Sequence, residues 1–301
     1  MSRVMVTGAS GFVGAAAVRA LLQQGDGVVA VVQPGTSTER LRRLSLQTVS
    51  LELEDCRAVE TALAQVKPET ILHAAWYARP EDYLVSPKNL DSLRATTDLF
   101  QAAVRSGCHR FVGIGTCLEY ARSDLPRREE ALSDPRSLYA SCKLSAWLLC
   151  RALAAKAGVS LAWARLFYLH GPDENQGRFL PALVNTLRAG RPFPMTAGEQ
   201  VRDYMHVDDT GRALALLCHP GADGLINIAS GQPTTLREFA LTAATLLDAG
   251  ALVGLGELPK RPDEEMFMVA DVTRLCALGF QPRHTSLQDG LGHTLQHWKT
   301  P

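Results

Sequence analysis

The sequence lacks the features that would assign it to several common classes of protein. It has no excess of charge, because 31 Lys and Arg residues balance 31 Asp and Glu residues, and its arginines form no tract. We therefore expect neither a nucleic-acid partner nor binding to an anionic membrane surface. It also has no run of about 18 apolar residues, so no transmembrane helix is expected.

The N-terminus and the cysteines lack the patterns of exported proteins. No basic segment followed by an apolar core begins the chain, so we expect no signal peptide. The seven cysteines are odd in number, scattered and free of CxxC pairs. This pattern predicts reduced thiols in a cytoplasmic protein rather than a disulfide framework or a zinc site, and we recognise no metal-ligand set.

The first fourteen residues carry the clearest local signal. Val4–Val6 are typical of a short buried strand, Thr7–Gly14 form a glycine-rich turn, and Ala15–Gln24 are helical in pattern. Three glycines at this spacing permit a tight turn, a close approach to a pyrophosphate and the packing of helix on strand. We therefore predict a dinucleotide site at Gly8, Ser10, Gly11, Phe12, Val13 and Gly14.

Strands alternate with helices through the first half of the chain. This alternation, with nearly continuous apolar strands, predicts an α/β fold with a doubly wound parallel sheet. After residue 170 the rhythm breaks, which predicts a smaller mixed C-terminal domain over the strand ends. We place a dinucleotide-binding domain at 1–170, to which 205–230 return, and an interleaved substrate-binding domain at 171–301. The expected strands are 27–32, 48–53, 70–75, 110–115, 160–167, 200–206 and 225–229, and the expected helices are 39–44, 57–65, 88–106, 138–157, 179–189, 208–217, 235–247 and one from 285.

Candidate catalytic residues follow the strand at 110–115. Thr116 ends that strand, and Tyr139 and Lys143 lie four residues apart on one face of the next helix. An ammonium beside a phenol favours the phenolate, so we expect Lys143 to lower the pKa of Tyr139 and make it an acid/base near neutrality. The alternative is a packed tyrosine beside a snorkelling lysine, which the N-terminal glycine turn disfavours.

With these motifs in place, the chain resembles the extended short-chain dehydrogenase/reductases, the NAD-dependent epimerase/dehydratase family that modifies nucleotide-linked sugars. Thr7–Gly14 resemble its TGxxGxxG motif, and Tyr139 and Lys143 resemble its YxxxK. His73, Ala74 and Ala75 resemble its HxAA, which lies beside the nicotinamide ribose. The resemblance extends over nearly the whole chain.

The resemblance also implies where substrate binds. Arg202 begins a segment similar to RDYxHVxD, whose arginine contacts the substrate diphosphate, and Arg261 resembles a later arginine with the same role. Residues 175–181 lie where the family shapes its nucleotide pocket. The implied substrate set is Trp76, Thr116, Tyr168, Arg178, Arg202 and Arg261, and the cofactor set adds Gln33, Arg40, Leu53, His73, Ala74, Ala75, Tyr139 and Lys143.

Departures from the family pattern reduce the number of reactions that we expect this chain to catalyse. Its dehydratases carry Asp-Glu directly after the active-site Thr, whereas this chain has Cys117 and Leu118 there, and Glu119 is displaced by one residue. We expect Cys117 to be a small buried thiol. Leu118 and Asp173 replace the Cys and His of the family's GDP-fucose-forming enzymes. Tyr168 replaces the family's usual Asn before the GP dipeptide.

The second strand bears on the choice of cofactor. NAD sites usually place an acid at its end, on the ribose 2′-hydroxyl, but Gln33 holds that place here. Thr36, Ser37 and Arg40 follow and could hold a 2′-phosphate. We therefore favour NADP(H), with NAD(H) as the alternative; a solvated helix face would equally account for Arg40 and Arg43.

These observations predict an NAD(P)H-dependent reductase of a nucleotide-linked keto-deoxy sugar, a 4-ketoreductase in which Tyr139 donates the proton. The alternatives are a 4-epimerase with retained NAD, a reductase of a non-nucleotide ketone, and a non-catalytic NAD(P)-sensing protein. We also expect a homodimer, because the helices at 88–106 and 138–157 carry apolar residues, including Trp147, beyond those that one core needs.

Overall fold

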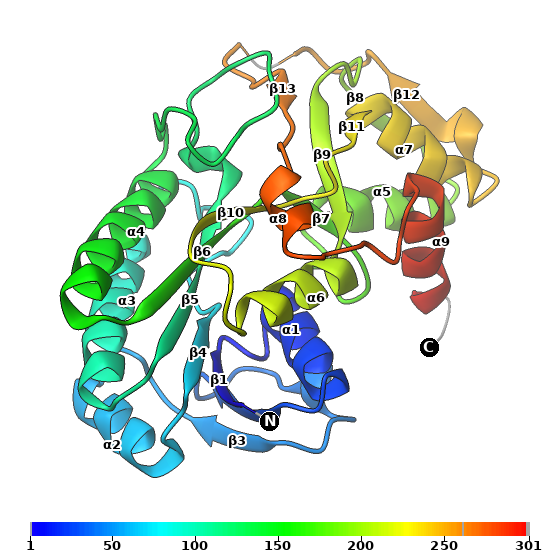
Figure 1. Cartoon of the computed structure of the whole chain (residues 1–301). Helices are drawn as coiled ribbons and strands as arrows, with labels where there is room; N and C mark the ends of the chain where they lie inside the picture. The colour runs from blue at the N-terminus through cyan, green and yellow to red at the C-terminus, as the bar shows by residue number, and fades with distance from the viewer. Residues whose placement is uncertain (1, 261, 299–301) are drawn as a thin grey trace.

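A seven-stranded parallel sheet forms the centre of the molecule (Figure 1). The computed structural model describes residues 2–260 and 262–298. All neighbouring strands pair in parallel in the order β10-β6-β5-β4-β1-β2-β3. The predicted α/β doubly wound fold is therefore confirmed. The strands are β1 Arg3–Thr7, β2 Gly27–Val32, β3 Gln47–Ser50, β4 Thr70–His73, β5 Arg110–Thr116, β6 Ser160–Leu166 and β10 Gly224–Ile228.

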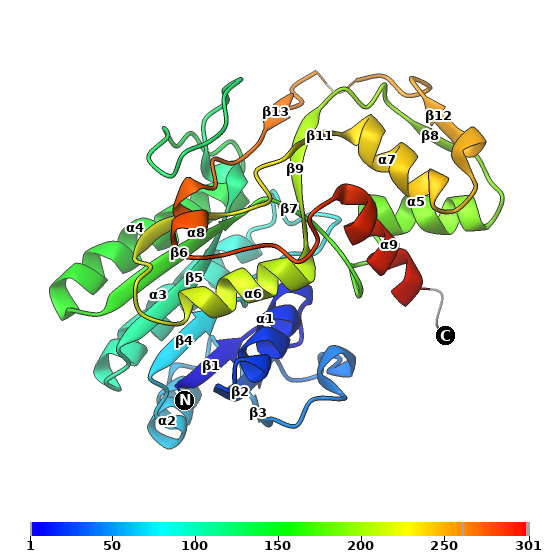
Figure 2. The ribbon, with the colours of Figure 1, turned by 45° about the vertical axis from the view of Figure 1, so that its right-hand side comes forward.

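Helices cover both faces of this sheet (Figures 1 and 2). One apolar core lies between the sheet and α1 Phe12–Gln23 with α6 Val207–Leu217. A second core lies between the opposite face and α2 Cys56–Val66, α3 Lys88–Arg105 and α4 Leu138–Ala157. Burial on both faces explains why the strands read as continuous apolar runs.

The later part of the chain forms smaller sheets above the strand ends. β9 Val201–His206 pairs with β7 Tyr168–His170, β11 Pro233–Thr235 and β13 Phe267–Met268, and β8 Phe193–Met195 pairs with β12 Val253–Leu255. A third core joins helices α5 Phe179–Arg188, α7 Leu236–Thr245 and α9 Leu287–His297, and the short α8 Thr273–Ala277 lies near β10.

Several element boundaries differ from the predictions. The helix expected at 39–44 is one 3-10 turn, Glu39–Leu41, and the strand expected at 70–75 ends at His73. The α6 helix begins at Val207 and is capped by His206, whose Nδ1 accepts from the N–H of Asp208. The α9 helix begins at Leu287 and is capped by Ser286, which accepts from the N–H of Asp289. At both helix starts the boundary depends on which polar side chain reaches the free N–H groups.

Trp147 corrects one premise of the dimer prediction. The side chain is buried, with its ring centroid 6.1 Å from that of Trp163 in the core beneath α4. It packs on the sheet and is not available to a partner. The exposed large apolar side chains on α3 and α4 are instead Leu90, Leu148 and Leu149.

Within the described part of the chain, no helix combines the length and apolarity needed to cross a bilayer.

Candidate active site

The glycine turn has the close backbone packing that a dinucleotide site requires. Gly8 has φ of +63°, and a Cβ there would lie 2.6 Å from the backbone nitrogen of Ala75. A Cβ at Gly14 would lie 2.1 Å from the carbonyl oxygen of Gly8. Gly11 precedes α1 and supplies no side-chain cap, so the first N–H groups of the helix remain available to an anion. The turn therefore fits the pyrophosphate of a nicotinamide dinucleotide.

The region after β2 contains an acid that sequence reasoning missed. The side-chain amide of Gln33 donates to Glu52 Oε2 at 3.1 Å. Because β2 and β3 are parallel neighbours, their carboxyl ends meet at one sheet edge, and Glu52 lies two residues after the end of β3. A carboxylate is thus present beside Gln33, although not at the sequence position where it was expected.

Arg40 lies against the glycine turn. Its Nη1 donates to the carbonyl oxygen of Ser10 at 3.1 Å, and its Nη2 donates to the carbonyl oxygen of Asp173 at 2.7 Å. The hydroxyls of Ser10 and Thr36 are 3.5 Å apart. The guanidinium therefore lies between the glycine turn and the loop that follows β7.

His73 has a structural role in this arrangement. Its Nδ1 is 2.7 Å from Thr7 Oγ1 and its Nε2 is 2.8 Å from Thr96 Oγ1, so both ring nitrogens are occupied. Burial, with Lys143 nearby, lowers the pKa of His73 to about 3. The neutral ring fixes the end of β4, and Ala74 and Ala75 follow it beside the glycine turn.

Thr116, Tyr139 and Lys143 come together at the ends of β5 and α4. The hydroxyl of Thr116 lies near enough to the phenol of Tyr139 to oppose the rise in its pKa. Lys143 Nζ donates to the carbonyl oxygen of Ile114 at 2.7 Å and lies 5.9 Å from the Tyr139 ring centroid. The three predicted catalytic residues thus form one cluster.

The protonation of this cluster differs from the prediction. Burial, then the nearby Tyr83, raises the pKa of Tyr139 above its ordinary value. Burial also lowers the pKa of Lys143 to about 7, although Glu119 opposes that change. The predicted lowering of the tyrosine pKa by the lysine is therefore wrong in this structure, because desolvation outweighs the charge of the ammonium.

Aromatic side chains surround the phenol. The ring centroid of Trp76 is 6.4 Å from that of Tyr139, and the Trp76 ring covers Lys143 Nζ at 3.8 Å. Tyr83, which sequence reasoning missed, lies edge-on to Tyr139 at 5.0 Å. The guanidinium of Arg178 lies 4.9 Å from the Tyr83 ring. Trp76 and Arg178 are therefore brought to the catalytic cluster from two different parts of the chain.

Two further predicted substrate residues lie together on β7 and β9. The Arg202 guanidinium lies 5.2 Å from the Tyr168 ring centroid, and its Nη2 donates to the carbonyl oxygen of Glu265 at 2.6 Å. Arg202 is buried, and Glu264 lies 3.9 Å away. Arg261, the other predicted diphosphate ligand, lies outside the described residues.

Cys117 and Glu119, which follow Thr116, lie in the core, and Cys117 is the small buried thiol that was predicted. Cys117 is a buried thiol, and burial raises its pKa to about 12. Glu119 points into the core, where its Oε2 accepts from Arg165 Nε at 2.7 Å and its Oε1 accepts from the N–H of Thr116. The carboxylate therefore holds the end of β5 in place and is already fully engaged.

Glu174 is a second acid that sequence reasoning missed. The residue is 9 % exposed. Its Oε2 is buried and has no hydrogen-bond partner, which is true of no other buried side-chain oxygen or nitrogen among the described residues. Burial raises its pKa to about 8, and nearby Arg178 opposes that rise. Burial raises the pKa of Tyr204 on β9, Arg202 opposes that rise and the Glu174 carboxyl adds to it, so Glu174 lies near β9.

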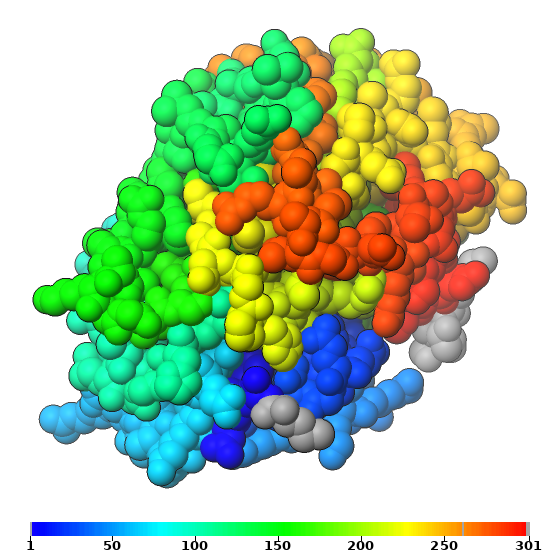
Figure 3. Space-filling view, in the orientation of Figure 1, coloured from blue at the N-terminus to red at the C-terminus, as the bar shows by residue number. Residues whose placement is uncertain are grey.

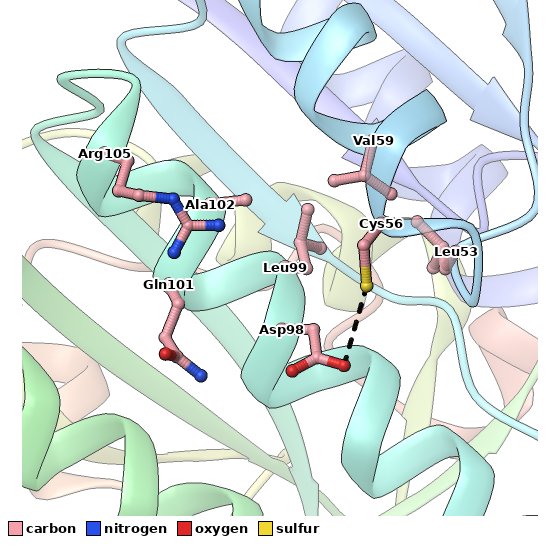
Figure 4. Close-up of a pocket in the computed structure, with 8 residues that line it drawn as sticks. All are labelled: Leu53, Cys56, Val59, Asp98, Leu99, Gln101, Ala102 and Arg105. Carbon is pink, nitrogen blue, oxygen red and sulfur yellow. Dashed lines mark hydrogen bonds between the residues drawn. The ribbon is translucent and has the colours of Figure 1, made fainter.

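Leu53, a predicted cofactor residue, lies in the loop after β3. It lines a cavity of about 70 Å³ between α2 and α3 (Figure 4). Cys56 and Asp98 lie in the same cavity, and their Sγ and Oδ2 atoms are 3.9 Å apart. None of the three catalytic candidates lines this cavity.

Comparison with known proteins gives one consistent result. Residues 4–229 match the model of the NAD dependent epimerase/dehydratase family. The chain is 25 % identical to a UDP-glucose 4-epimerase of Azospirillum brasilense over 99 % of its own length and 92 % of that protein. It is 26 % identical to a dTDP-glucose 4,6-dehydratase of Mycobacterium tuberculosis, over 99 % of this chain and 93 % of the other.

Solved structures agree with this match. MoeE5 in complex with UDP-glucuronic acid and NAD has a TM-score of 0.84 at 29 % identity, covering 99 % of each chain. DesIV, a dTDP-glucose 4,6-dehydratase of Streptomyces venezuelae with NAD bound, has a TM-score of 0.88 at 25 % identity, covering 99 % of this chain and 97 % of that one.

Proposed function

Because the chain belongs to the NAD-dependent epimerase/dehydratase family, we propose that it is an NAD(P)H-dependent reductase of a nucleotide-linked 4-keto-deoxy sugar. The observation that carries the proposal is the meeting of Thr116, Tyr139 and Lys143 in one buried cluster, while Glu119 is turned away from it against Arg165. Burial raises the pKa of Tyr139, which is consistent with a phenol that donates a proton. A reduction needs an acid at the carbonyl oxygen, whereas a reaction that begins by oxidising an alcohol needs a base.

Different residues of this chain bind the cofactor, donate the proton and orient the substrate. The glycine turn and Lys143 would hold the cofactor, which supplies the hydride when bound. Tyr139 Oη donates its proton to the carbonyl oxygen of the substrate, and Thr116 Oγ1 orients that oxygen by a hydrogen bond. The buried ammonium of Lys143 retains donors beyond the one used by Ile114.

The side chains beyond the cluster support a nucleotide-linked substrate. Arg178 and Arg202 are guanidinium groups suited to bidentate contact with a diphosphate. Removal of water would need an acid directly beyond Thr116, and the side chains there are Cys117 and Leu118. Glu119 is turned into the core against Arg165. These facts favour reduction over dehydration.

For the cofactor, we propose NADPH. Arg40 is fixed against Ser10 of the glycine turn, and Thr36 lies beside Ser10. A charge-assisted contact to a 2′-phosphate contributes about 1.5–3 kcal/mol. Arg40→Ala is therefore expected to lower kcat/KM for NADPH by roughly ten- to a hundredfold and to leave the value for NADH nearly unchanged.

A second candidate is a 4-epimerase with retained NAD, and Glu52 favours it. This carboxylate lies beside Gln33, where it could accept from ribose hydroxyls and would repel a 2′-phosphate. One experiment separates the two functions. The purified protein is given NADPH and a UDP- or dTDP-linked 4-keto-6-deoxyglucose, and absorbance at 340 nm is followed.

A reductase consumes one NADPH for each alcohol formed. Stoichiometric NAD in the purified protein, with interconversion of C4 epimers and no net cofactor consumption, would establish the epimerase instead. Gln33→Asp serves as a matched probe, because the new carboxylate is expected to shift preference toward NADH.

A further inference from the structure

Three histidines and an aspartate meet at the N-terminus of α6, away from the catalytic cluster. One potential ligand atom from each of His206, Asp208, His284 and His293 lies within 4.8 Å of the others. His206 and Asp208 begin α6, His284 lies in the segment before α9, and His293 lies on α9. Figures 1, 2 and 3 show this segment crossing the molecule beside α6 to reach α9.

The hydrogen bonds identify the nitrogen of His284 that can bind a metal. His284 Nδ1 is 3.0 Å from Asp289 Oδ2, so this nitrogen carries the proton and donates to the carboxylate. Nε2 is left with a free lone pair. A histidine whose other ring nitrogen donates to a carboxylate has the orientation and basicity typical of a metal ligand.

His206 is held differently. Its Nδ1 accepts from the N–H of Asp208 and caps α6, so the neutral ring carries its proton on Nε2, which lies 3.2 Å from His293 Nδ1. His206 is buried and committed to the helix end. His284 and Asp208 are partly exposed and His293 is exposed, and an ion bound at His293 Nδ1 would take the place of the hydrogen bond from His206.

We propose that His284, His293 and Asp208 bind a divalent ion of the Zn²⁺ class, with solvent in the fourth position and His206 forming the wall behind them. Nitrogen and carboxylate ligands are those that Zn²⁺ prefers, and three protein ligands with one solvent position is a common arrangement. Tetrahedral bonds of about 2.0–2.1 Å place ligand atoms roughly 3.3 Å apart. Small side-chain rotations must therefore close the present separations.

The proposed ion would fasten the C-terminal segment to the body of the molecule. Asp208 already pairs with Arg19 of α1 at 3.3 Å, and α1 and α6 pack closely, since a Cβ at Gly211 would lie 2.4 Å from the carbonyl oxygen of Ala16. The ion would thus link α9 to the helix that follows the glycine turn. Because it binds the folded chain, it raises the melting temperature.

The test uses the full chain without a histidine tag, freed of metal by a chelator that is then removed. Zn²⁺ binding is measured by isothermal titration calorimetry and by the zinc content after gel filtration. We expect one ion per chain and a melting temperature that rises with the concentration of Zn²⁺. His284→Gln and His293→Gln should each weaken binding at least tenfold, and Asp289→Asn by about 10–100-fold.

His297→Gln is the matched control. It lies four residues after His293 on the same helix and is exposed, so the two could chelate an ion at the helix surface without the other residues. Loss of binding in His297→Gln with retention in His284→Gln would overturn the proposal. A wild-type chain that binds no Zn²⁺ at a concentration of about 100 micromolar would overturn it as well. Melting temperatures without metal show whether each variant is folded.

Discussion

Replacing Glu174 by glutamine gives a pH-dependent change in stability whose sign the structure fixes. The folded chain raises the pKa of this carboxyl from 4.5 to about 8 by burying it. Below pH 4.5 both folded and unfolded chains keep the proton. Between these two pKa values only the folded chain keeps it, so the wild-type free energy of unfolding falls as pH rises and levels off above pH 8.

The size of this loss follows from the same values. A shift of 3.5 pKa units, the difference between about 8 and 4.5, corresponds to about 5 kcal/mol over the whole titration. About 3 kcal/mol of this falls between pH 5.5 and 8.5, because the unfolded chain has already lost most of its proton at pH 5.5. We expect about 1–3 kcal/mol over that interval, because local rearrangement reduces the cost of ionisation. Glutamine carries no ionisable proton, so the stability of Glu174→Gln should not follow this titration. The free energy of unfolding of the variant minus that of wild type should therefore increase by about 1–3 kcal/mol from pH 5.5 to pH 8.5.

The assay is urea unfolding of both proteins at pH 5.5 and 8.5, followed by circular dichroism. Glu199→Gln, which alters an exposed carboxyl, is the control and should give the same difference at both pH values. The reasoning would be refuted if the stability difference between Glu174→Gln and wild type were equal at the two pH values. It would also be refuted if that difference moved in favour of wild type at pH 8.5.

Three further predictions concern other parts of the molecule. Gly14→Ala places a Cβ 2.1 Å from the Gly8 carbonyl oxygen and should abolish cofactor binding or folding. Gly292→Ala lies within α9 and meets nothing within 4 Å, so it should leave cofactor binding unchanged and raise the melting temperature slightly, because alanine favours a helix over glycine. Arg165→Met leaves Glu119 buried without its 2.7 Å partner and should cost about 3–5 kcal/mol in the free energy of unfolding. We also propose a homodimer through Leu90, Leu148 and Leu149; light scattering should give twice 32.6 kDa for wild type and a smaller mass for Leu148→Glu, and a monomeric wild type would reject it.

The sequence predicted what is encoded locally. The glycine turn, the parallel strands and the Tyr139–Lys143 pair each depend on residues within a few positions of one another. Their spacing alone fixes a turn, a buried strand or a shared helix face. The fold class and the family follow from these features together.

The parts that sequence reasoning missed depend on contacts between distant segments. Glu52 reaches Gln33 only because β2 and β3 are neighbours, and Glu174 meets Tyr204 only because β7 and β9 pair. Trp147 was misplaced because an apolar helix face does not reveal whether a sheet or a partner covers it. The pKa of Tyr139 could not be foreseen, since burial depends on Trp76 and Tyr83 from another part of the chain.

The most direct test of the proposed function is a single-turnover comparison of wild type with Tyr139→Phe, using NADPH and the nucleotide-linked 4-keto sugar. The phenylalanine keeps the ring and its packing but removes the proton donor. We expect cofactor binding within about twofold of wild type and a rate of carbonyl reduction lower by roughly 10²–10⁴-fold. A variant that retains more than about a tenth of the wild-type rate would contradict the assignment of Tyr139 as the proton donor.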